Sequence, residues 1–170
     1  MTKNAANKTV RAVFHDDIAY TSPTHWYVVH TKPYQEFRAL EQLQNQDYEC
    51  YLPTLQVTKL YRGKSGLIIE PLFSRYLFIH LDNANTDWGP IRSTRGVSNM
   101  VSFGGRFAIL PANYVAALKN MPQHGAENEL APRAHEQINS EISSELRELH
   151  HLPNGGARAF VLIELMRQTH

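Results

Sequence analysis

A short segment near the middle of the chain places cations and hydroxyls beside a glycine. Arg92-Ser93-Thr94-Arg95-Gly96 offers two guanidinium groups and two hydroxyl groups, which are side chains that contact phosphate in nucleic-acid complexes. Surface loops are generically polar, so a solvated turn is the more frequent origin of such a composition. These five residues alone leave both interpretations open.

A second polar set is expected on a helix that follows Pro33. Proline suits the first turn of a helix, where its missing N–H is not needed. Apolar residues recur at helical spacing as far as Asn45, and polar residues share the opposite face. The apolar positions are Phe37, Leu40 and Leu43. The polar positions are Gln35, Arg38 and Gln42, with Lys32 at the start of the helix.

The segment from Tyr76 to Leu81 predicts a strand with two apolar faces. Its bulky and branched residues suit a pleated strand, in which successive side chains point to opposite faces. One face carries Leu77, Ile79 and Leu81, and the other carries Tyr76 and Phe78. If one face meets the core, another part of the chain or a partner must cover the other.

Residues typical of catalysis lack organised partners. The sequence shows no nucleophile–base pair, no phosphate-cradling glycine loop and no metal-ligand spacing. His15, Asp16 and Asp17 have no second ligand group at a defined distance, and His150 and His151 are equally isolated. We therefore expect no enzyme, no catalytic residue, no metal and no cofactor.

The elements that position these residues alternate in type. A strand is expected from Trp26 to Thr31, followed by the helix after Pro33. Further strands are expected over 50–61, 67–69, 97–101 and 107–110, and helices over 88–93 and 111–121. The basic turn at 62–66 could touch nucleic acid or be solvated. This order predicts an α+β fold, an antiparallel sheet flanked by helices.

The C-terminal part differs from the rest in pattern. Residues 122–134 contain two prolines, a glycine and charges, which indicate a linker. An amphipathic helix is expected next, because apolar residues are spaced by four, four and three. They are Ile138, Ile142, Leu146 and Leu149. A stop follows at 153–156, and the apolar run 160–163 fits either a buried strand or a helix.

Composition limits the class of protein. The 170 residues, 42% of them hydrophobic, suffice for one domain and a small second one. Residues 26–121 carry ten Lys and Arg against seven Asp and Glu, whereas residues 122–170 carry four against seven. The single cysteine, Cys50, fits a reducing cytosol. No apolar run approaches the roughly 18 residues of a membrane span, so we expect a cytoplasmic protein without a membrane partner.

Three motifs, in this order, resemble the N-terminal domain of the NusG family of transcription elongation factors. They are WYVVHTKPYQEFRALEQL from Trp26, EPLFSRYLF from Glu70 and IRSTRGVSNMVSFGG from Ile91. The spacing from Trp26 through Arg95 fits the specialised RfaH-type members without a gap. Those members also share the Glu70-Pro-Leu-Phe segment and the later Gly-Gly-Ala-Arg segment. The resemblance implies a NusG-type N-terminal domain over 25–121, after a disordered extension over 1–24.

In RfaH-type members this domain binds the clamp helices of the RNA polymerase β′ subunit through an apolar patch. By position, the patch would comprise Phe73, Tyr76 and Phe78, although ordinary core packing stays open for these aromatic residues. The loop around Trp88 would reach the opposite lobe of the polymerase. It transfers only as a unit, because Asp87-Trp88-Gly89-Pro90 replaces a polar run of RfaH.

The resemblance also implies contact with single-stranded non-template DNA in the transcription bubble. Such a strand offers base edges, stacking faces and phosphates to a surface of cations and amides. The implied residues are Lys32, Gln35, Arg38, Gln42, Thr94 and Arg95. Gln42 replaces a histidine of RfaH, so a different DNA element is expected.

For residues 135–170 the resemblance implies a helical hairpin that masks the polymerase patch, with a KOW-type β-barrel as the alternative state. The KOW glycine is missing before Pro153 and the chain ends at His170, short of where the family places its last strand, so a degenerate or truncated KOW-like domain is expected. An ion pair between Glu70 and Arg158 would fix the register. Apolar contacts would carry the closure. They are Ile142, Leu146, Leu149, Phe160 and Leu165.

The expected function is therefore an operon-specific elongation and antitermination factor, monomeric and autoinhibited by its C-terminal segment. One alternative is a general NusG-like elongation factor, which an intact barrel would favour. Another is a ribosome- or RNA-binding module, since KOW folds also occur in ribosomal proteins; a ribosome partner thus stays open.

Overall fold

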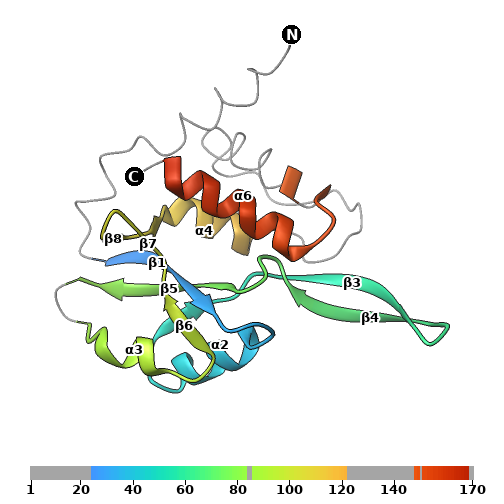
Figure 1. Ribbon diagram of the computed structural model, residues 1–170, viewed down its shortest axis with the longest axis horizontal. Helices are drawn as coiled ribbons and strands as arrows, with labels where there is room; N and C mark the ends of the chain where they lie inside the picture. The colour runs from blue at the N-terminus through green and yellow to red at the C-terminus, as the bar shows by residue number, and fades with distance from the viewer. Residues whose placement is uncertain (1–23, 84–85, 122–147, 150, 169–170) are drawn as a thin grey trace, which may run out of the picture.

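The computed structural model describes residues 24–83, 86–121, 148–149 and 151–168. Its centre is an antiparallel sheet in the order β2-β5-β1-β6, with β9 also pairing with β1. The strands are β1 (Thr24–Thr31), β2 (Glu49–Tyr51), β5 (Tyr76–Asp82), β6 (Val97–Met100) and β9 (Ile109–Leu110). Helices α2 (Glu36–Gln44) and α3 (Gly89–Ser93) cover one side, and α4 (Ala112–Lys119) and α6 (Gly155–Gln168) the other (Figure 1). The predicted α+β class is confirmed.

Strand β5 separates two hydrophobic clusters because its side chains alternate between the faces of the sheet. Leu77, Ile79 and Leu81 join the cluster under α2 and α3. Phe78 joins the cluster under α4 and α6, and Tyr76 packs at its edge. Both faces of the strand are therefore covered by the chain itself.

The prediction of a single strand over 50–61 is wrong, because the strand is interrupted at Leu52 and Pro53. β2 pairs with β5 in the main sheet, whereas among the described strands β3 (Thr54–Tyr61) pairs with β4 (Lys64–Pro71) alone. This hairpin extends away from the sheet (Figure 1). Arg62 and Gly63 connect its strands with φ values of 50° and 76°, the positive values of a tight hairpin turn. A second, short hairpin joins β7 (Ser102–Phe103) and β8 (Arg106–Phe107).

The first helix begins later than the sequence predicts. Pro33 lies in a turn, and α2 starts at Glu36. Its buried residues are Glu36, Ala39 and Leu43, whereas Phe37 is 47% exposed. The apolar periodicity predicted that Phe37 would be buried. In the structure the small side chain of Ala39 lies against Gly96 at the centre of the contact, and Phe37 lies toward solvent.

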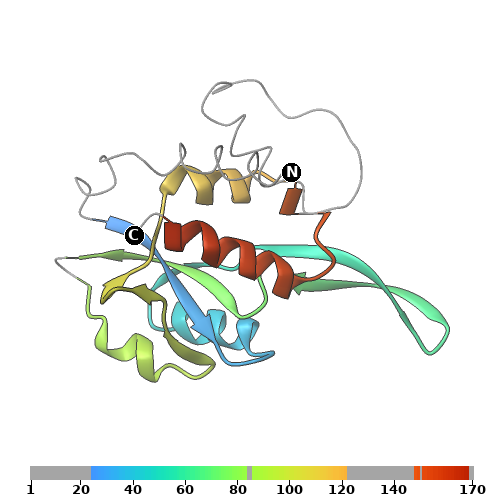
Figure 2. The same ribbon diagram turned by 45° about the horizontal axis from the view of Figure 1, so that its top comes forward.

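The C-terminal region contributes helix α6, which runs beside α4 on one side of the sheet (Figure 2). The run 160–163 is thus helical, and Gly155 and Gly156 begin the helix. The predicted linker 122–134 and the residues Ile138, Ile142 and Leu146 lie outside the described residues, as do the extension and His15, Asp16 and Asp17. None of the described helices is long and apolar enough to cross a membrane.

Candidate nucleic-acid and protein interfaces

Three segments that are distant in sequence meet at the end of β1. The Lys32 N–H donates to the carbonyl of Gly96, and the Thr31 N–H donates to the carbonyl of Arg75, both at 2.8 Å. The Arg75 N–H in turn donates to the buried Glu36 carboxylate of α2 at 2.9 Å. The segment 92–96, which runs from the end of α3 to the residue before β6, and the start of α2 therefore form one continuous surface.

Gly96 allows this loop to approach α2. It has a φ of +91°, and a Cβ atom built there would lie 2.8 Å from the Ala39 nitrogen and 3.1 Å from the Ala39 Cβ. A side chain would therefore push the loop off the helix. The close approach places Arg95, the preceding residue, beside the first turns of α2.

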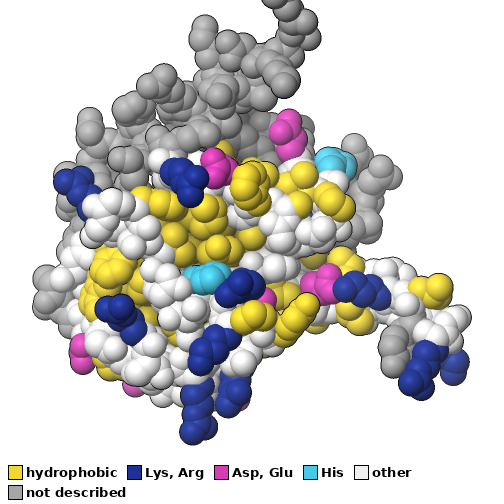
Figure 3. Space-filling view, in the orientation of Figure 1, with side chains coloured by type: hydrophobic (Ala, Val, Ile, Leu, Met, Phe, Trp, Pro, Cys, Tyr) yellow, Lys and Arg dark blue, Asp and Glu magenta, His cyan; other side chains and the backbone are white. Residues whose placement is uncertain are grey.

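The surface made by these segments is rich in cations. Lys32, Arg38, Arg92 and Arg95 are all exposed, and we call them, with their segments, the basic face. Lys and Arg side chains gather over this part of the molecule, below the sheet as drawn (Figure 3). Three of the four were predicted to bind DNA, and the structure brings these three together.

Thr94 has a different environment from its predicted neighbours. It is 7% exposed, and its hydroxyl donates to the Pro90 carbonyl at 2.9 Å. The same oxygen accepts a hydrogen bond from Gln46 Nε2 at 3.0 Å. Thr94 therefore ties its loop to the end of α2, and direct contact of its side chain with DNA is not available in this geometry. Sequence reasoning missed Gln46, although Gln46 lies one helical turn after Gln42.

Two aromatic residues at the start of α2 were also missed. Tyr34 is 98% exposed and Phe37 47% exposed, on the same segment as Lys32 and Arg38. Gln35 and Gln42 are half-buried at the edge of this surface. The Pro33-Tyr34 pair was a signal that could have predicted a turn here, because proline is favoured at the second position of β-turns.

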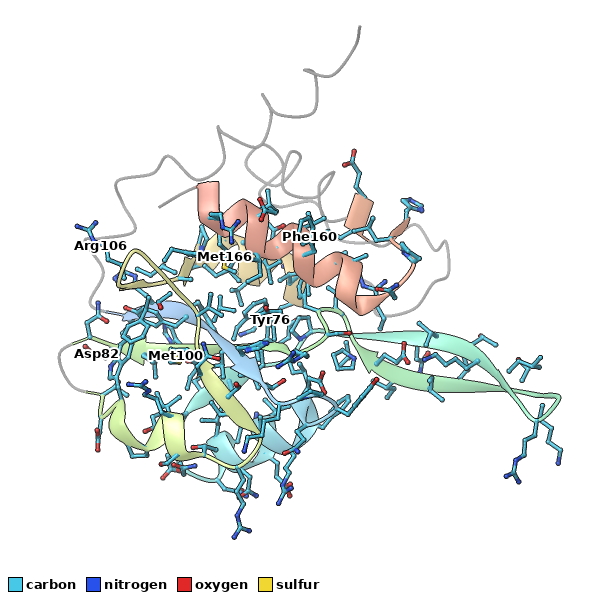
Figure 4. All side chains as sticks on the ribbon, in the orientation of Figure 1. Tyr76, Asp82, Met100, Arg106, Phe160 and Met166 are labelled. Carbon is cyan, nitrogen blue, oxygen red and sulfur yellow. The ribbon has the colours of Figure 1, made fainter. Side chains whose placement is uncertain are left out.

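The predicted polymerase patch lies on the other side of the sheet. Phe73 and Phe78 have no exposed surface, and their ring centroids are 6.0 Å apart. Tyr76 is partly buried beside His30, with ring centroids 5.0 Å apart. Leu162 and Met166 of α6 belong to the same cluster, and Figure 4 shows Tyr76 beneath this helix. Together we call Phe73, Tyr76 and Phe78 the aromatic patch.

Helix α6 docks through its first residue. The Ser74 N–H donates to the Gly155 carbonyl at 3.0 Å. A Cβ atom on Gly155 would collide with the Ser74 Oγ and lie 3.1 Å from the Ser74 nitrogen and 3.2 Å from the Pro71 carbonyl. A side chain at position 155 would displace the Ser74 hydroxyl and press on the backbone of the 71–75 turn, and a large one would push the helix away.

Arg158 fastens the same end of α6. It is 4% exposed, and its Nε donates to the Leu72 carbonyl at 2.7 Å and its Nη1 to the Leu152 carbonyl at 3.0 Å. Burial lowers the pKa of Arg158, and the charge of Glu70 partly counters this. Glu70 itself pairs with Lys59. The expected direct ion pair between Glu70 and Arg158 is therefore replaced by two guanidinium–carbonyl bonds. The bond to Leu72 joins the helix to the 71–75 turn, and the bond to Leu152 lies within the C-terminal segment.

The other predicted contacts of the C-terminal segment differ in their outcome. Leu149 and Leu165 are buried, at 3% and 7% exposure. Phe160 is 68% exposed, because positions 159, 162 and 166 define the inward stripe of the helix (Figure 4). The expected contact of Phe160 with the domain is thus wrong. Ile142 and Leu146 lie outside the described residues.

A family model described as Transcription termination factor nusG matches residues 24–119, more than half of the chain. The chain belongs to the NusG family. It is 32% identical over 88 residues to the transcription termination/antitermination protein NusG of Streptomyces coelicolor, and 26% identical over 90 residues to that of Streptomyces griseus. These matches cover 46% and 48% of this chain but only 29% and 31% of the relatives, so the chain covers less than a third of their length.

A solved structure described as Domain interaction in Thermotoga maritima NusG aligns with 56% of this chain and 55% of its own. The sequence identity is 17% and the TM-score is 0.40.

The part of this NusG-family chain that the family model matches, residues 24–119, contains the sheet, the basic face and the aromatic patch. It ends at Lys119, before α6 begins.

Trp88 of this NusG-family domain lies apart from the aromatic patch. Its ring packs edge-on against the Tyr27 ring, with centroids 4.7 Å apart. It packs at a tilt against the Phe107 ring, with centroids 5.1 Å apart. Both contacts are near the start of α3, where Trp88 packs on the cluster under α2 and α3. A partner that touches Trp88 would therefore contact a different surface from one that touches Tyr76.

Proposed function

We propose that this NusG-family protein is a transcription elongation and antitermination factor that acts on selected operons. The aromatic patch binds the clamp helices of the RNA polymerase β′ subunit, and the loop around Trp88 reaches the opposite lobe. The basic face holds the exposed non-template DNA strand. The observation that carries the proposal is the aromatic patch lying under α6, a helix outside the matched family domain.

The basic face supports the DNA-binding part of the proposal. Lys32, Arg38 and Arg95 come from two separate segments, and backbone hydrogen bonds hold them on one side of the domain. Exposed cations on a rigid surface suit a phosphate backbone. Gln35 and Gln42 lie where amides could contact base edges. Thr94 acts by fixing the loop that presents Arg95.

The docking of α6 supports autoinhibition. Its inward residues share a cluster with Phe73 and Phe78, so a polymerase helix and α6 would compete for the same surface. The 71–75 turn contacts both sides, because the Ser74 amide binds α6 and the Arg75 amide binds Glu36 of α2. A movement of α2 on binding DNA would therefore shift the 71–75 turn and weaken its contact with α6. A change of residues 135–170 into a β-barrel stays a prediction.

The test compares polymerase binding by Gly155→Leu and Gly156→Leu. Leucine at Gly155 collides with the 71–75 turn, whereas Gly156 is exposed and its added Cβ meets only Asn154 Oδ1, at 3.2 Å. If Gly155→Leu weakens the docking of α6 by about 1.4 kcal/mol, the open protein becomes about tenfold more populated. We therefore expect this variant to bind elongation complexes about tenfold more tightly than the parent. Adding Tyr76→Ala should remove the gain. Equal binding by the parent and Gly155→Leu, in protein shown to have released α6, would contradict the proposal.

The two alternatives have their own outcomes. A general NusG-like factor would show no gain in polymerase affinity when α6 is released, and it would act on templates of any sequence. A ribosome- or RNA-binding module would sediment with ribosomes and leave elongation complexes unbound. The buried state of the aromatic patch favours the autoinhibited factor over both.

A further inference from the structure

The turn between β1 and α2 contains a residue in an unfavourable conformation. The Gln35 N–H donates to the Lys32 carbonyl at 3.1 Å, which closes a four-residue turn with Pro33 second and Tyr34 third. Tyr34 has a φ of +58°, the value that a turn with proline second and a positive φ third requires. Glycine or asparagine normally occupies the third position, since a bulky side chain is strained there.

Tyr34 receives no packing that offsets this strain. Its ring is 98% exposed, so the side chain contributes almost no buried surface to the fold. Phe37, three residues later in the first turn of α2, is also exposed, at 47%. Backbone strain that the fold itself does not use points to a role outside the folded chain.

The surroundings of the two rings define the chemistry of a partner. Lys32 is the first residue of the turn and Arg38 follows Phe37, and both are exposed. Arg95 is held nearby, because the Lys32 N–H donates to the Gly96 carbonyl at 2.8 Å. Aromatic rings among cations match single-stranded nucleic acid, whose unpaired bases stack while its phosphates meet the charges. Bases within a duplex have no free faces for such rings.

We propose that Tyr34 and Phe37 form a base-stacking platform for single-stranded DNA at the edge of the basic face. Lys32, Arg38 and Arg95 hold the phosphates, and the rings select unpaired bases. This inference rests on the proposed DNA-binding function and adds to it the residues that contact bases. The turn fixes the backbone of Tyr34 and leaves its ring exposed to solvent, where both faces are free to stack on a base.

The experiment measures fluorescence anisotropy of the full chain with a labelled 12-nucleotide DNA and a series in which one base at a time is removed. Removing a base keeps the phosphate, so loss of affinity reports contact with the base alone. For the parent protein we expect about tenfold weaker binding at one or two positions, since a stacked base contributes on that scale. In Tyr34→Gly the loss at one of these positions should disappear, and Tyr34→Trp should retain it.

The Tyr34→Gly variant should lose DNA affinity without losing thermal stability. Tyr34→Gly relieves the positive φ, so the melting temperature should stay the same or rise while DNA binding weakens. Phe107→Ala serves as a matched control, because Phe107 is 41% exposed but lies beside Trp88. It should leave DNA binding unchanged. Equal DNA affinity of the parent, Tyr34→Gly and Phe37→Ser would overturn the stacking platform.

Other outcomes separate this inference from the function on which it rests. If Arg38→Ala and Arg95→Ala weaken binding to every oligonucleotide but the aromatic variants do not, the stacking platform fails and the DNA-binding face stands. If neither arginine variant weakens binding, the DNA-binding face itself fails. RNA of the same sequence that binds more tightly, with the same dependence on Tyr34, would overturn DNA as the ligand.

Discussion

The fastening of α6 by Arg158 can be tested with a matched pair of arginines on the same helix. Arg158→Met keeps the aliphatic stem but removes both guanidinium–carbonyl bonds, to Leu72 and Leu152. Arg167→Met removes an exposed pair with Glu164, three residues earlier, at 3.2 Å. The two substitutions are chemically identical and differ only in what the guanidinium holds.

The expected magnitudes differ widely. A hydrogen bond to a charged group contributes about 1.5–3 kcal/mol. Only the bond to Leu72 joins α6 to the domain, because Leu152 lies in the same C-terminal segment as Arg158, so its loss should weaken closure by about 1.5–3 kcal/mol. At about 1.4 kcal/mol per factor of ten, the ratio of docked to undocked α6 falls by roughly 10- to 100-fold. The exposed pair of Arg167 contributes less than about 0.5 kcal/mol, which is about a twofold change.

Hydrogen exchange of backbone amides measures this ratio directly. Amides of residues 159–166 should lose about 10- to 100-fold in protection in Arg158→Met and about twofold in Arg167→Met, while amides of β1 and β5 keep theirs. Equal protection of α6 in the two variants would refute the fastening role of Arg158. If β1 and β5 lost protection as much as α6, the helix would not open separately from the domain, and closure would not be a switch.

Four further results are expected. Gly96→Ala should destabilise the domain by about 1–3 kcal/mol in urea unfolding, since its Cβ meets the Ala39 backbone; unchanged stability would contradict that packing. Phe78→Ala should cost about 3–5 kcal/mol, because the ring is fully buried, so a value below about 1 kcal/mol would show that the ring is not core. Burial lowers the pKa of His30 below 6.5, so thermal stability should fall as the pH drops below 6.5 and His30→Gln should flatten that slope. Burial, with a smaller effect of the Glu49 charge, raises the pKa of the Cys50 thiol to about 12, so iodoacetamide at pH 8 should react much faster with unfolded than with native protein.

The sequence determined which local elements form and which face of each is apolar. The alternation of β5 follows from period-two spacing, so Leu77, Ile79 and Leu81 share one cluster, as predicted. It also showed that the face bearing Tyr76 and Phe78 needs a cover. The cations of the basic face were recognisable because the motifs that contain them resemble a known family.

Tertiary structure decided the properties that depend on contacts between distant segments. Thr94 is a polar loop residue in sequence, but Gln46, 48 positions away in the chain, makes it a buried tether. Phe37 fits an apolar stripe, but the packing of Gly96 against Ala39 rotates the buried face away from it. The same reason applies to α6. Its composition allowed strand or helix. Its docked position depends on the apolar cluster with Phe73 and Phe78 and on hydrogen bonds with the Ser74 N–H and the Leu72 carbonyl, and contacts between such distant segments leave no periodic signal in sequence.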